Sequence, residues 1–171
     1  IIGTAKLSAY DNLHIRGHEE IFLERAQKRL KQMDNLNAQI GPIYVIHPDN
    51  KELDKLVKKE ITLKSTYSFN AMDGCKHEMW IVNEKSKVLK ICDLFNTINR
   101  IYIADGHHRA ASASRVHKEM TKNKPTENVK ESYNYFLATI FPHDEMQIMG
   151  YNRVVKDLCG LSDEQFISKL R

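Results

Sequence analysis

Apolar residues recur at helical spacing near the start of the chain, within residues 17–33. The residues that fall mostly on one face of this stretch are Ile21, Leu23, Ala26, Leu30 and Met33. Charged residues fill the other positions, which is the pattern of an amphipathic helix. The pattern therefore predicts a helix from Gly17 to about Met33.

Further along, the pattern alternates between short apolar runs and amphipathic stretches. It predicts a strand at 43–46, a turn at 47–50 and a helix through about Glu60. A hairpin of residues 67–69 and 77–82 around Asp73-Gly74 follows, and then a helical turn at 93–98 and a strand at 101–104. After a loop at 121–130, the pattern predicts a strand at 133–141, one or two strands within 148–158, and a final helix from Ser162. Because strands and helices do not alternate regularly, the order favours an α+β fold over a doubly wound α/β fold.

Length and composition restrict the class of protein. The 171 residues fit a single domain spanning 1–171, and because the chain begins with Ile1 and stops within an amphipathic pattern, we expect a fragment of a longer protein. The net charge of +4 is spread along the chain, which suits small anionic ligands better than nucleic acid. Three widely spaced cysteines indicate reduced thiols in a cytoplasmic protein, and no apolar run is long enough to cross a membrane.

The densest group of chemically active residues is Asp105-Gly106-His107-His108-Arg109. It lies between an apolar run and a helical stretch, so it predicts a strand, a tight turn and a helix start. Such a junction directs free backbone N–H groups at one point, where an anion binds. The Arg109 guanidinium suits phosphate oxygens, and the histidines could bind phosphate, a metal ion or a proton. The pattern indicates phosphate chemistry.

Two other interpretations of this turn are open. In the first, Asp105 caps the helix and the histidines are partly exposed. In the second, the turn belongs to a metal-dependent hydrolase. Adjacent histidines on a helix diverge by about 100°, however, so a shared metal ion would need ligands from elsewhere.

A second group, His18-Glu19-Glu20, directly precedes the first predicted helix and follows Gly17. The glutamates could simply be first-turn acids that stabilise the helix through its dipole. Alternatively, Glu19 is a general base whose placement the glycine permits. Asn152 and Arg153 end an apolar stretch, and they are either a solvated strand end or contacts to a nucleotide or a substrate carboxylate.

Several stretches together resemble a large family of proteins of unknown function that carry an ADGHHR signature. These stretches are YDNLHIRGHEE, GPIYVI, HEMW, YIADGHHRAASA and YNRVVKDLCGLS. That family is similar to free-serine kinases built on the fold shared by sulfiredoxin and the ParB nucleotidases. The resemblance implies a ParB/sulfiredoxin-like mixed sheet flanked by helices.

The resemblance also implies roles for individual residues. The kinases' His-Glu pair corresponds to His18 and Glu19, with Glu19 orienting or deprotonating the substrate hydroxyl. Asp105 would hold Mg²⁺ or assist proton transfer. The residues implied to bind the nucleotide phosphates are Gly106, His107, His108 and Arg109.

The expected function is therefore a kinase that uses ATP or ADP with Mg²⁺ to phosphorylate a small hydroxyl substrate, with free L-serine giving O-phosphoserine. Positioning and charge neutralisation supply most of the catalysis in phosphoryl transfer, which agrees with these residue types. The alternatives are a ParB-like switch module that binds or hydrolyses a nucleotide, and a metal-dependent hydrolase. The sequence leaves the donor, the acceptor and the oligomeric state open.

Overall fold

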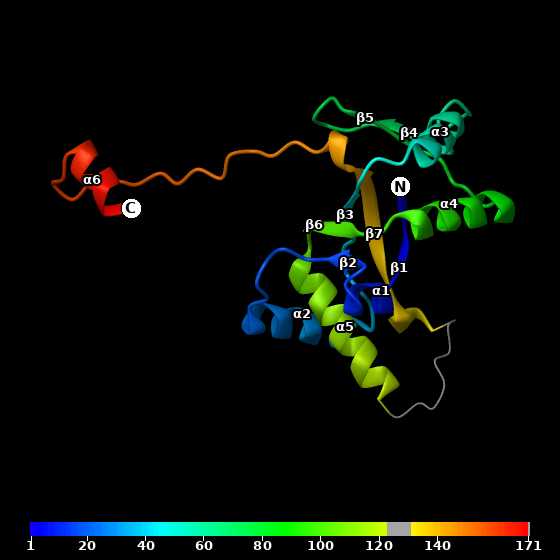
Figure 1. Cartoon of the computed structure of the whole chain (residues 1–171), viewed down its shortest axis with the longest axis horizontal. Helices are drawn as coiled ribbons and strands as arrows, with labels where there is room; N and C mark the ends of the chain where they lie inside the picture. The colour runs from blue at the N-terminus through cyan, green and yellow to red at the C-terminus, as the bar shows by residue number, and fades with distance from the viewer. Residues whose placement is uncertain (123–130, 171) are drawn as a thin grey trace.

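The computed structural model describes residues 1–122 and 131–170 (Figure 1). Its strands are β1 (Ile2–Lys6), β2 (Ile15–Arg16), β3 (Ile43–His47), β4 (Tyr67–Asn70), β5 (Lys76–Met79), β6 (Ile101–Asp105) and β7 (Tyr135–Pro142). Its helices are α1 (Leu7–Asp11), α2 (Leu23–Leu36), α3 (Lys51–Glu60), α4 (Lys85–Thr97), α5 (His107–Thr121) and α6 (Asp163–Leu170), with short 3-10 turns η1 (Ser132–Asn134) and η2 (His143–Glu145).

A five-stranded mixed sheet has the order β1-β7-β3-β6-β2, and β4 and β5 form a separate hairpin. β3 runs parallel to β7 and antiparallel to β6, so Tyr44 pairs with Asp105 while His47 pairs with Pro142. The turn after β6 therefore lies at the opposite end of the sheet from the turn after β7. This arrangement confirms the predicted α+β class with helices flanking a mixed sheet.

The core forms where the sheet meets α1 and α5. Along β3, buried and half-buried residues alternate, as expected for a strand with one face inward. The fully buried larger side chains include Leu7, Ile15, Ile43, Val45, Ile103 and Phe136, and Ala110 and Ala113 of α5 join them. In Figure 1, α1, α2 and α5 gather at one end of the sheet, and α3, α4 and the hairpin lie toward the other.

Several elements agree with the sequence pattern because local chemistry decides them. Asn50 precedes α3, and its side-chain oxygen accepts a hydrogen bond from the Leu53 N–H at 3.0 Å. At α6, the Ser162 N–H donates to Gln165 and the Gln165 N–H donates back to Ser162, forming a capping box. The hairpin also forms, with Asp73 accepting from the Cys75 N–H in its turn.

The prediction that a helix begins at Gly17 is wrong, because α2 begins only at Leu23. No side chain caps α2, and the backbone before it is extended. The N–H groups of His18 and Phe22 instead donate to the histidine rings of α5. These distant contacts hold the segment in a non-helical conformation. Glu19 and Glu20 are consequently not first-turn acids of the helix.

Two further expectations need correction, although residues 93–97 are helical as predicted. α4 starts at Lys85, well before the predicted helical turn at 93–98, and Lys87 near its start forms an ion pair with Glu60 of α3 at 2.7 Å. No strand forms among residues 148–158, where Ile148 and Val154 are each 96 % exposed. Apolar residues there have no neighbouring strand to pair with. Most of the loop predicted at 121–130 falls outside the described residues.

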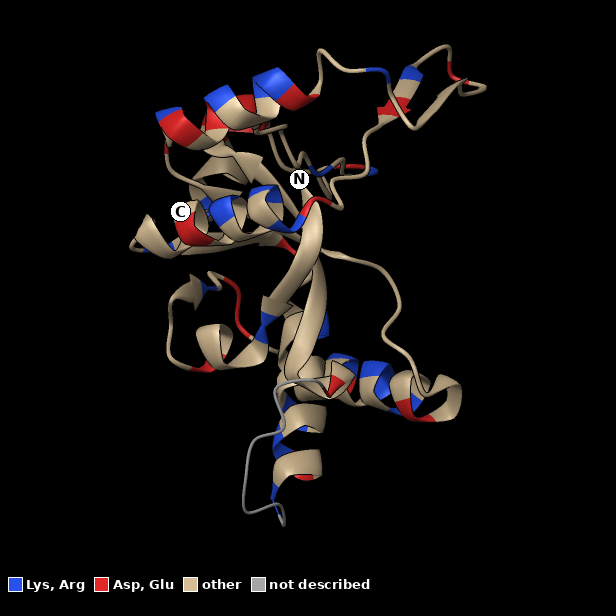
Figure 2. Ribbon diagram, turned by 90° about the vertical axis from the view of Figure 1, so that its right-hand side faces the viewer, with Lys and Arg blue, Asp and Glu red and all other residues tan. Residues whose placement is uncertain are grey.

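Within the described part of the chain, no helix has the length and apolar character required to span a bilayer. Cys75, Cys92 and Cys159 are free and exposed. Figure 2 shows acidic and basic residues interspersed along the helices rather than separated into regions of one sign.

Candidate functional site

The turn between β6 and α5 is shaped by a glycine that no other residue could replace without strain. Gly106 has a φ of +99°, and a Cβ placed on it would lie 2.8 Å from Nη2 of Arg109. Gly106 is also the N-cap of α5, and it offers no side chain to accept from the first helical turn. The first N–H groups of a helix have no partner within the helix, so this end of α5 presents uncapped donors and the positive end of the dipole.

Asp105 and Arg109 flank this glycine and pair with each other. Oδ2 of Asp105 lies 2.6 Å from Nη2 of Arg109, one helical turn further on. The Asp105 side chain is 74 % exposed, whereas the Arg109 side chain is 29 % exposed. The interpretation in which Asp105 caps the helix is therefore wrong, because Gly106 holds the cap position and Asp105 binds the arginine.

His107 is buried and lies between the backbone of His18 and the carboxylate of Glu19. Its Nε2 accepts the His18 N–H at 3.2 Å, so this nitrogen is unprotonated. Its Nδ1 lies 3.1 Å from Oε2 of Glu19, an ion-pair distance at an angle that falls outside hydrogen-bond geometry. Burial lowers the pKa of His107 below its ordinary value, and the Glu19 carboxylate opposes this shift in pKa. We infer a neutral ring with its proton on Nδ1, facing Glu19.

The approach of the His18 backbone to this ring depends on Gly17. A Cβ on Gly17 would lie 3.0 Å from Cδ2 of His107, closer than ordinary van der Waals contact. The His18 ring meets the His107 ring edge to face at 4.4 Å between centroids. The segment from Gly17 to Glu19 is therefore fitted closely to the start of α5.

His108 fixes the other end of the same segment. Its Nε2 accepts the Phe22 N–H at 3.2 Å, and its ring lies nearly parallel to the Phe22 ring. One turn later, the Ser112 hydroxyl hydrogen-bonds the carbonyl of Ala26 in α2 and that of His108. Because the bonds to His18 and Phe22 lie on either side of Glu19, α5 determines where this carboxylate is held.

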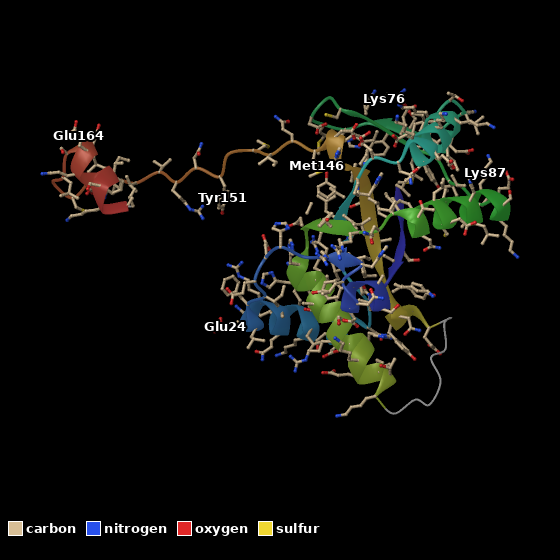
Figure 3. All side chains as sticks on the ribbon, viewed as in Figure 1. Glu24, Lys76, Lys87, Met146, Tyr151 and Glu164 are labelled. Atoms are coloured by element: carbon tan, nitrogen blue, oxygen red, sulfur yellow. The ribbon has the colours of Figure 1, made fainter. Side chains whose placement is uncertain are left out.

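The structure brings most of the predicted site residues together. His18 and Glu19 come from the segment after β2, Asp105 from the end of β6, and Gly106 to Arg109 from the start of α5. Asn152 and Arg153 are not part of this group. Cζ of Arg153 lies 4.0 Å from the centroid of the Tyr151 ring. Tyr151 is on the extended segment that leads away from the sheet to α6 (Figure 3).

The arrangement combines an exposed acid with donors for an anion. The Glu19 side chain is 54 % exposed, so it is open to a substrate although His107 holds it in place. The uncapped start of α5 begins at His107, the residue beside Glu19, and Arg109 follows two positions later on the same helix, so these groups can hold negative charge. Such a group of residues is suited to proton transfer beside a bound phosphate.

Metal-ligating residues also gather elsewhere. Asp49, His143 and Asp144 have potential ligand atoms within 4.8 Å of one another, and all three are exposed. They follow the parallel strands β3 and β7, so they lie at the opposite end of the sheet from Asp105. Sequence reasoning did not select these residues, because only the parallel pairing of β3 and β7 brings them together.

Sequence reasoning also missed the surroundings of Arg109. Gly41 lies in the loop that leads into β3, and a Cβ on it would lie 3.5 Å from Nη1 of Arg109. Arg29 lines a pocket with Arg109. The pairing of glycine with proline at 41–42 was the one signal for a close approach at this point.

A family model described as "Protein of unknown function (DUF1015)" matches residues 1–171. Comparison with curated proteins and with solved structures finds no match.

Proposed function

Because this chain belongs to the DUF1015 family of unknown function, we propose its function from the site itself: a nucleotide-dependent phosphotransferase that acts on a small hydroxyl substrate. The resemblance to free-serine kinases makes L-serine the first acceptor to test, with O-phosphoserine as product. One observation carries the proposal. Nδ1 of His107 lies 3.1 Å from Oε2 of Glu19, which places an open carboxylate beside the uncapped start of α5.

The residues of the turn fit the phosphate chain of ATP or ADP. The first turn of α5 lacks a side-chain cap, and Gly106 adds no side chain of its own beside the first N–H groups of the helix. Arg109 adds a guanidinium whose planar fork suits phosphate oxygens. Mg²⁺ is commonly held by one or two carboxylates together with substrate phosphates, and Asp105 is the carboxylate available at this turn. A bound Mg²⁺ would neutralise charge on the transferring phosphate.

In the proposed reaction, Glu19 accepts the proton of the substrate hydroxyl while the hydroxyl oxygen bonds to the terminal phosphorus of the nucleotide. The bond between that phosphorus and the bridging oxygen breaks, and the electron pair leaves with the shortened nucleotide. His107 remains neutral and acts as a positioning residue that keeps the Glu19 carboxylate directed at the site. Arg109 and the N–H groups of α5 balance the negative charge of the phosphate.

The contacts of the histidines favour this proposal over a metal-dependent hydrolase. The Nε2 atoms of His107 and His108 both accept backbone N–H groups, and Nδ1 of His107 faces Glu19. A metal ion would need these lone pairs, so binding it would require the segment from His18 to Phe22 to be released.

Replacement of Glu19 by Gln tests the proposal. The chain, and the longer protein if it is part of one, is incubated with ATP or ADP, Mg²⁺ and a panel of hydroxyl compounds that includes L-serine, and products are identified by mass spectrometry. We expect phosphoserine from the unmodified protein. Glu19→Gln should lower its rate by about 100-fold or more, the size of a general-base contribution, while nucleotide affinity changes little.

Glu20→Gln is the matched control, because it makes the same chemical change at the adjacent position, and it should retain the rate. No phosphate transfer to any hydroxyl compound with either nucleotide would overturn the proposal. Nucleotide hydrolysis without an acceptor, unchanged by Glu19→Gln, would favour the switch module instead.

A further inference from the structure

Arg109 also lines a small pocket beside the candidate site. The pocket is formed by α2, the loop that leads into β3, and the first turn of α5. Met33 and Ile43 contribute apolar wall, while Arg29, Gln39 and Arg109 contribute polar groups. It has room for a small group rather than for a nucleoside.

The charge of the pocket is entirely positive. Among the described residues that line it there are two arginines and no carboxylate. Arg29 donates to the neutral side-chain oxygen of Gln32 at 3.0 Å, so its charge is not compensated by that bond. Asp105 compensates part of the charge of Arg109 from outside the pocket, so a bound anion would be attracted by Arg29 together with the atoms of Arg109 that Asp105 does not bind.

Arg109 has a donor atom without a partner. Its Nη2 is bound by Asp105, but its Nε is buried and has no hydrogen-bond partner. A buried donor without a partner is costly and calls for an acceptor. Gly41, with a φ of +75°, lets the loop approach Nη1 of Arg109 without a side chain in between.

We propose that Arg29 and Arg109 form a phosphate subsite that binds one phosphate group of a polyphosphate chain. The inference rests on the proposed function, because it extends the same nucleotide site. Arg109 belongs to both parts: Asp105 binds Nη2 of its guanidinium near the start of α5, and its Nη1 lies beside the Gly41 loop that lines the pocket. A polyphosphate chain can therefore run from the N–H groups of α5 past Arg109 to Arg29.

The test is a calorimetric titration with inorganic tripolyphosphate, which carries the phosphate chain without a nucleoside. We expect the unmodified protein to bind it and Arg29→Gln to weaken binding by roughly tenfold or more, as for loss of a charge-assisted hydrogen bond. Lys28→Gln removes the same charge one position earlier, which points about 100° away on the helix, and should leave the affinity within about twofold. Circular dichroism checks that both variants fold.

Each outcome decides between the possibilities. Equal losses in Arg29→Gln and Lys28→Gln, no loss in Arg29→Gln, or no binding by the unmodified protein would overturn the subsite. A titration with O-phosphoserine tests whether the pocket instead binds the phosphate of the product. If Arg29→Gln weakens the affinity for O-phosphoserine but not for tripolyphosphate, the pocket serves the product and the proposal is wrong.

The result is also separable from the proposed function. Binding of tripolyphosphate that depends on Arg29, without phosphate transfer to any hydroxyl compound in the panel, would support the subsite and refute the kinase. Phosphoserine formation with a nucleotide KM that Arg29→Gln leaves unchanged would support the kinase and refute the subsite.

Discussion

Replacement of Gly106 by Ala separates the conformational role of this residue from its role in placing Arg109. A Cβ on Gly106 would lie 2.8 Å from Nη2, 2.9 Å from Nε and 3.3 Å from Cζ of Arg109. Contacts of this kind normally begin near 3.4 Å, so the guanidinium has to move by at least about 0.6 Å, the difference between 3.4 and 2.8 Å. The displaced group leaves the position from which it contacts Asp105 and faces the pocket.

The matched variant is Gly74→Ala. Gly74 also has a left-handed φ, +83°, but a Cβ there would meet nothing within 4 Å. Both variants therefore carry the left-handed backbone cost of about 1–2 kcal/mol, and only Gly106→Ala moves Arg109. The ion pair with the exposed Asp105 adds little to stability, so the free energies of unfolding of the two variants should agree within about 1 kcal/mol.

Urea denaturation and tripolyphosphate titration together provide the assay. Both variants should lose similar stability, whereas only Gly106→Ala should lose anion affinity, by about tenfold, because a guanidinium contact to phosphate is geometrically demanding. Normal affinity in Gly106→Ala would refute the inference that the position of Arg109 depends on the glycine. An equal loss of affinity in Gly74→Ala would show that backbone strain alone explains the effect.

Two further predictions concern stability. Because burial holds the pKa of His107 below its ordinary value of 6.5, the unfolded chain takes up a proton first as pH falls, so the free energy of unfolding should decline below pH 6.5. Equilibrium denaturation between pH 7.5 and about 5 should show a shallower decline in His107→Gln, and a decline as steep as that of the unmodified protein would contradict the assignment. Asn50→Ala removes the cap on the Leu53 N–H and should lower the free energy of unfolding by about 1 kcal/mol in urea denaturation, whereas an unchanged midpoint would mean that the cap contributes nothing.

The sequence predicts best where neighbouring residues decide the structure. The strand, turn and helix around Gly106 are local features, and so are the cap at Asn50 and the capping box of Ser162 and Gln165. In each of these places, the residues that decide where an element begins or ends lie within a few positions of one another. These features therefore require no knowledge of the remainder of the chain.

Prediction fails where contacts between residues far apart in the sequence decide the local structure. The helical pattern of residues 17–22 is overridden by hydrogen bonds to residues 86 and 89 positions further along the chain. β1 pairs with β7 from the other end of the sequence, and its own residues carry little strand signal. Residues 148–158 show the reverse case, because a strand-like apolar pattern finds no partner strand. In the candidate site, Arg29 and Gly41 were missed for the same reason.

The divergence of His107 and His108 on α5 has a different consequence from the one expected for a metal site. Adjacent helical residues point about 100° apart, which is unfavourable for sharing one ion but suits two hydrogen bonds to separate points on another segment. Those points are the N–H groups of His18 and Phe22, and Glu19 lies between them. Arg109 follows directly on the same helix. One helical turn of α5 thus holds both the carboxylate and the guanidinium, so any displacement of this turn changes the distance of both groups from a substrate at once.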